Sequence, residues 1–139
     1  MAEPPLNPMI AVLAGGLYAA CVFGVAFMSG MLRTSLLGMF EEIAPVWAVL
    51  VELPVILLAS WLICGWVIRS RKVPSAIGAR TLMGAVALTL IILAEGVLTG
   101  LATGRGLGGV LASYQRLEVL LGLAGQIAFA AFPLVRKRY

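Results

Sequence analysis

Four polar side chains lie within or next to long apolar stretches of this 139-residue chain. They are Arg33, Glu52, Glu95 and Gln126. An ionisable group in the middle of a membrane span costs at least about 2.5 kcal/mol, so each needs a partner or a function. Together they could form a buried ion pair with hydrogen bonds, or they could bind a proton or a cation.

The residue types that are missing narrow the chemistry further. The chain has no histidine and no aspartate, and its only asparagine is Asn7. This excludes haem ligation by imidazole, general-base catalysis by histidine, the usual zinc sites and the Asp-rich motifs that hold magnesium. The sequence therefore predicts a protein that is not an enzyme and holds no cofactor and no metal.

The elements that must position these residues are apolar helices. Apolar residues make up 62% of the chain and charged residues 12%, and the mean hydropathy is +1.07. Apolar runs cover residues 9–30, 44–68, 80–101 and 117–135. Each can cross a hydrocarbon core about 30 Å thick, and none alternates as a barrel strand would. We predict an all-α membrane protein, a single domain over residues 1–139 built as a bundle of four transmembrane helices.

The distribution of basic residues predicts the orientation. Cytoplasmic loops carry an excess of Lys and Arg. Seven basic residues belong to the loop after the second span and the C-terminal tail, and only three to the other side: Arg69, Arg71, Lys72, Arg80, Arg136, Lys137 and Arg138 against Arg33, Arg105 and Arg116. Both termini are therefore expected to be cytoplasmic, in a multi-pass protein of a bacterial inner membrane. The basic residues behind the net charge of +4 then lie next to the lipid bilayer, within reach of anionic lipid headgroups. No nucleic-acid partner is expected.

The depths of the polar residues predict a cluster. At 1.5 Å per residue, Glu52, Glu95 and Gln126 lie roughly 12, 9 and 13 Å below the outer ends of their spans. Arg33 follows the first span, and its long side chain could reach a carboxylate at that depth. One interpretation is structural, with one carboxylate ionised against Arg33 and the other protonated. The other interpretation is a proton or cation site.

Small residues predict where helices pack. Gly16, Ala20 and Gly24 recur every four residues on one face of the first span. Such a face lets a neighbouring backbone approach closely. The partner helix could come from the same chain or from another copy. The glycine-rich connection 102–116 is expected to be mobile, and its role is left open.

A resemblance rests on short motifs spread over the chain from about residue 10. They are Gly30-Met31-Leu32-Arg33, Glu52-Leu53-Pro54 with Ser60-Trp61, Arg80 with Gly84 and Glu95, and Gly122 with Gln126 and Phe132-Pro133-Leu134. The chain resembles an uncharacterised family of small four-span integral membrane proteins of alphaproteobacteria. The resemblance implies four spans and the trio Arg33, Glu52 and Glu95, but it implies no activity. The chain differs from the family pattern after Arg33: the relatives carry an aromatic residue and a proline there, whereas this chain has Ser35 to Gly38.

Two functions are consistent with these observations. The first is a non-enzymatic accessory or scaffolding subunit of a membrane complex, with a membrane protein or a second copy as partner. The second is a small oligomeric transporter or channel coupled to protons or ions, using Glu52 or Glu95. The sequence identifies neither a substrate nor a partner.

Overall fold

The computed structural model describes residues 7–37, 45–104, 106–113, 115 and 117–136. The regular structure within these ranges is helical: α1 (Pro8–Leu37), α2 (Pro45–Arg71), α3 (Ile77–Thr103), α4 (Gly106–Ser113) and α5 (Leu117–Val135). Three helices contain stretches long and apolar enough to cross a membrane, Pro8–Leu32, Leu50–Arg71 and Ile77–Leu101. The apolar stretch of α5, Val119–Val135, is shorter than these three.

Local hydrogen bonds explain where three of the helices begin or end. The side chain of Asn7 accepts a hydrogen bond from the Met9 amide at 3.1 Å, which caps the start of α1. α2 stops where Lys72 takes a left-handed conformation, with φ of 51°. The Val73 amide then bonds back to the Ile68 carbonyl at 3.1 Å, a common way to satisfy the last carbonyls of a helix. Gly104 closes α3 in the same left-handed region, with φ of 64°.

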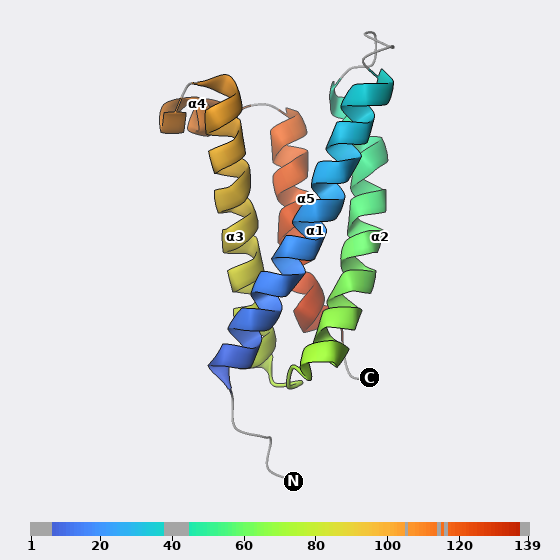
Figure 1. The fold of residues 1–139 in the computed structure, drawn as a ribbon, viewed down its shortest axis with the longest axis vertical. Coiled ribbons are helices and arrows are strands. Elements are labelled where there is room, and N and C mark those ends of the chain that lie inside the picture. The colour runs from blue at the N-terminus through green and yellow to red at the C-terminus, as the bar shows by residue number, and fades with distance from the viewer. Residues whose placement is uncertain (1–6, 38–44, 105, 114, 116, 137–139) are drawn as a thin grey trace.

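The four long helices form a closed ring. α1 packs on α2 and α3, and α5 packs on the same two helices from the opposite side of the ring (Figure 1). The rings of Tyr18 and Phe129 stack with centroids 4.3 Å apart, and the Tyr18 hydroxyl donates to the Phe129 carbonyl at 2.8 Å. These contacts tie α1 to α5 across the centre of the bundle.

The outer connections differ from the sequence-based expectation. α1 continues to Leu37, beyond the expected end at residue 30. The segment 102–116, expected to be a mobile loop, contains the helix α4, which lies across the end of α3 in Figure 1. The sequence of α4, GLGGVLAS, combines glycines with apolar residues, and a helix satisfies the backbone N–H and C=O groups of such a segment within the segment itself.

The close packing of α1 falls on a different face from the predicted one. A Cβ on Gly15 would lie 2.7 Å from the Met83 carbonyl oxygen, whereas one on Gly16 would lie 4.0 Å from the nearest Leu90 atom. Ala20 is exposed, and a Cβ on Gly24 would meet nothing within 4 Å. Within the chain, Gly16, Ala20 and Gly24 therefore make no close backbone contact, and packing of this face against another copy stays a prediction. The seam instead uses a face one residue earlier, where the small residues Ala11, Ala14, Gly15 and Ala19 lie around the buried Tyr18.

Candidate functional site

The bundle is packed at one end and loose at the other. Every side chain or glycine that the structure describes as buried lies in residues 8–22, 60–91 or 125–136, which we call the closed half. The remaining parts of the four long helices, residues 23–37, 45–59, 92–103 and 117–124, form the open half. The open half contains no buried residue among those whose side chains are described. α1 and α3 separate toward the end that carries α4, as Figure 1 shows.

The space around the glycines shows the same difference in packing between the two halves. In the closed half, a Cβ on Gly84 would overlap the Ala130 carbonyl oxygen, and one on Gly65 would overlap the Arg136 guanidinium. In the open half, a Cβ would meet nothing within 4 Å at Gly24, Gly30, Gly96, Gly100 or Gly122. Gly122 is the most informative of these, because it lies seven residues before Phe129 and so on the same helix face. That face is buried at Phe129 and open at Gly122.

An apolar groove runs between α1 and α3, mainly in the open half. Its volume is about 620 Å³, and it is lined by Phe23, Phe27, Leu90, Leu93, Ala94, Val97 and Leu98. The groove positions on α3 recur every three or four residues in two series, 90, 93 and 97 and 90, 94 and 98, so they share one helix face. The groove can accept an apolar chain or the side chains of another helix.

Glu95 and Gln126 are brought together on the neighbouring side of α3. The Gln126 amide donates a hydrogen bond to a carboxylate oxygen of Glu95, which joins α3 to α5. Glu95 is nevertheless exposed on the protein surface, and Gln126 is half-buried. A carboxylate with one amide donor keeps further lone pairs, so it can accept from a second donor, bind a cation or hold a proton.

The other two members of the predicted cluster are Glu52 and Arg33, and the structure describes the side chain of Glu52 only. Glu52 is half-buried on α2 in the open half, next to Leu53, whose side chain packs against Gly125 of α5. Arg33 belongs to α1, but its side chain lies outside what the structure describes. The pairing of Arg33 with a carboxylate stays a prediction.

Arg80 and Arg136, for which the sequence predicts a loop and a tail position, form part of the closed half. Arg80 is buried, and its Nε donates to the Pro74 carbonyl at 2.9 Å. Its terminal nitrogens lie 3.5 Å from the carbonyl oxygens of Val73, Pro133 and Arg136. Arg80 thus ties the α2–α3 connection to the end of α5. A sequence signal was present, because Arg80 is the only charged residue between Lys72 and Glu95.

Arg136 forms the second basic contact. Its guanidinium lies 4.8 Å from the centroid of the Trp61 ring and also donates to the Trp61 carbonyl. The missing side chain of Gly65 leaves room for it. Arg136 therefore joins the end of α5 to α2 through a cation–π contact and a hydrogen bond.

The described residues contain no group of three His, Cys, Asp or Glu side chains that could hold a metal ion. The polar groups whose contacts are given above bind main-chain carbonyls or one another across helices. This arrangement can fix helix positions and, at Glu95, accept a donor or a proton. Comparisons with protein families, with curated proteins and with solved structures gave no match to this chain.

Proposed function

We propose that the chain crosses a bacterial inner membrane four times, with both termini in the cytoplasm. Three helices have the required length. α5 lies alongside them in the same ring and spans roughly 28 Å over its 19 residues, close to the thickness of the hydrocarbon core. The exposed basic residues Arg69, Arg71 and Lys72 lie at the end where α1 begins and α5 ends. The positive-inside rule assigns that end to the cytoplasm.

Reporter fusions test this topology. Fusions after Arg71 and at Tyr139 are expected to be active as cytoplasmic reporters, and a fusion at Gly106 as a periplasmic one. An external signal from Tyr139 together with a cytoplasmic one from Arg71 would mean that α5 does not cross. External signals from both would mean that the orientation is reversed.

We propose that the protein is a non-enzymatic accessory subunit of a membrane complex, and that its open half receives a transmembrane helix of the partner. The observation that supports this function is the contrast between the two halves of one bundle. The closed half holds its helices by tight contacts at Gly15 and Gly84 and by carbonyl bonds to Arg80. The open half exposes the groove, several glycines and a carboxylate. In lipid, helices associate through close packing at small residues and through polar bonds, and the open half offers both.

The exposed carboxylate favours a different protein over a second copy. Two copies that meet face to face place the same residues against each other. A dimer through this face would bring two Glu95 carboxylates into one interface of low dielectric, where like charges repel. A partner helix with a hydrogen-bond donor or a basic residue at that depth would satisfy Glu95 instead.

Purification of the tagged chain from native membranes in mild detergent tests this function. We expect one membrane protein to be recovered in a fixed ratio with the chain. A Cβ on Gly122 meets nothing within 4 Å, so we expect Gly122→Leu to place its side chain in the open half, to fold, and to lose at least tenfold of the partner. Ala85→Leu adds the same side chain at an exposed position of the closed half, and it should retain the partner.

Two results would contradict the accessory role. Equal partner recovery with Gly122→Leu and Ala85→Leu would show that the open half is not the contact. Recovery of the chain only as a homo-oligomer would favour the second candidate, a proton- or ion-coupled transporter. The observation that favours that candidate is the Glu95–Gln126 pair, because a carboxylate in an open half can be reached by protons.

A further inference from the structure

A proline inside α5 frees one carbonyl group of the closed half. Pro133 lies within the helix and is fully buried. A proline nitrogen carries no hydrogen, so it cannot donate to the carbonyl four residues earlier, and its ring crowds that carbonyl. Within α5, Phe129 is the only residue with a proline four positions later. The Phe129 carbonyl must therefore find its donor outside the regular bonding pattern of its own helix.

The hydroxyl of Tyr18 meets this carbonyl from the opposite helix. It donates to the Phe129 carbonyl oxygen at 2.8 Å, and the two rings stack with their centroids 4.3 Å apart. Tyr18 is fully buried, and the buried Cys64 lies beside its hydroxyl. A buried hydroxyl needs a hydrogen-bond partner, and backbone groups freed by a proline in a membrane helix find partners on neighbouring helices. This bond satisfies a donor of α1 and an acceptor of α5 together.

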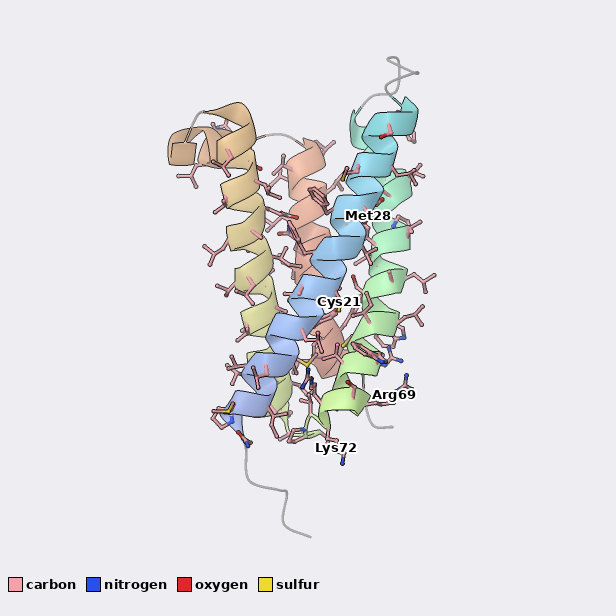
Figure 2. All side chains as sticks on the ribbon, in the orientation of Figure 1. Cys21, Met28, Arg69 and Lys72 are labelled. Carbon is pink, nitrogen blue, oxygen red and sulfur yellow. The ribbon has the colours of Figure 1, made fainter. Side chains whose placement is uncertain are left out.

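The bond lies between two helices that do not pack side by side. α1 and α5 stand on opposite sides of the ring (Figure 1), so Tyr18 reaches across its centre. In Figure 2, Cys21, three residues after Tyr18 on α1, lies between Met28 of the open half and Arg69 at the closed end. A bond at this level fixes how far α5 extends along α1.

We propose that Tyr18 and Pro133 form a latch that sets the register of α5 in the ring. From residue 117 to residue 128, the residue four positions later always carries an amide N–H. If α5 slid toward the closed end by one turn, the hydroxyl would meet a carbonyl already bonded within the helix. The Phe129 carbonyl would also lose its donor in an apolar interior. A single buried polar contact is an attested way to fix the register of helices whose surfaces are otherwise apolar.

A double-mutant cycle on the full chain in detergent tests the latch. Tyr18→Phe removes the hydroxyl and keeps the stacked ring, and it should raise the equilibrium constant for unfolding about tenfold. Pro133→Ala supplies an amide that can donate to the Phe129 carbonyl within α5. In the Pro133→Ala background, Tyr18→Phe should change the unfolding constant by less than about threefold, because the carbonyl keeps a donor.

Pro54→Ala is the matched control for the cycle. Pro54 also lies inside a long helix, α2, but its missing amide would bond to Leu50 and not to Phe129. Tyr18→Phe should therefore cost as much in the Pro54→Ala background as in the parent chain. An equal cost in all three backgrounds would overturn the latch, and so would the absence of any cost in the parent chain.

A carbonyl signal decides between the outcomes even if Pro133→Ala fails to fold. Phe129–Ala130 is the only place in the chain where an alanine follows a phenylalanine. Labelling the phenylalanine carbonyls with ¹³C and the alanines with ¹⁵N therefore gives one carbon–nitrogen correlation in the magnetic resonance spectrum, from the Phe129 carbonyl. Hydrogen bonding deshields a carbonyl carbon, so Tyr18→Phe should move this signal upfield. An unchanged signal would show that the hydroxyl does not bond to this carbonyl, and the proposal would fail.

Discussion

Replacing Arg80 by alanine is expected to destabilise the bundle by roughly 3 kcal/mol or more. The side chain is buried and donates to the Pro74 carbonyl at 2.9 Å, with three further carbonyls at 3.5 Å. A hydrogen bond from a charged donor contributes about 1.5–3 kcal/mol, and a buried carbonyl without a donor costs about 1–3 kcal/mol. Because Arg80 joins the α2–α3 connection to α5, its loss should also release the end of α5. Thermal unfolding in detergent measures the effect.

Two further variants give this prediction its controls. Arg71→Ala removes an exposed guanidinium nine residues earlier and should change stability by less than about 0.5 kcal/mol. Arg80→Lys keeps the charge, but an ammonium group cannot match the planar fork that reaches several carbonyls at once, so little stability should return. If Arg80→Ala and Arg71→Ala melted at the same temperature, Arg80 would not hold the connection to α5.

The spans were predictable because transfer into lipid depends on composition over about 20 residues, whichever direction the side chains point. Three of the four predicted runs meet the length and hydropathy of a span. The fourth forms a helix over Leu117–Val135, as its apolar residues predict, but its most apolar stretch is shorter. The end of α1 was less predictable, since residues 31–37 are neither strongly apolar nor interrupted by proline.

The contacting faces were not predictable, because the helices are apolar on all sides. Gly16 and Gly15 are both small, and spacing alone favours the series Gly16, Ala20 and Gly24. Which glycine meets α3 depends on how α1 crosses it, and that crossing is set by all the contacts of the ring. Only the folded chain shows that Gly15 lies against the Met83 carbonyl while Gly24 has open space beside it.

The candidate site was predictable in part. Depth along the spans indicated that Glu95 and Gln126 lie at a similar level, and the two side chains are hydrogen-bonded. Depth could not indicate that Glu95 lies in the loosely packed half of the bundle, next to its border with the closed half at Gln126, since that follows from the divergence of whole helices. The apolar run of residues 80–101 begins at Arg80, which is why the sequence predicts a loop position for this residue. Yet α3 begins at Ile77, which places Arg80 in its first turn.

The second large effect is expected at Gly84. A Cβ there would overlap the carbonyl oxygen of Ala130 and lie 3.2 Å from its carbonyl carbon. Both atoms belong to the backbone of α5, so no side-chain rotation can make room. Gly84→Ala should push α3 and α5 apart, at a cost of about 1–3 kcal/mol for overpacking. Lipid tails are as apolar as the helix surfaces, so no hydrophobic driving force offsets this cost, and helix association depends on the close contact itself. Thermal unfolding in detergent measures it.

Gly96→Ala is the matched control on the same helix. It makes the same chemical change twelve residues further along α3, in the open half, where an added Cβ meets nothing within 4 Å. Alanine is favoured over glycine in a helix by up to about 1 kcal/mol, so Gly96→Ala should leave the melting temperature unchanged or raise it. The two alanines thus carry the same gain in helix propensity, and their difference isolates the contact with Ala130. If Gly84→Ala were as stable as Gly96→Ala, α3 and α5 could not be in backbone contact. The division into a closed and an open half would then fail, because that contact is among its tightest points.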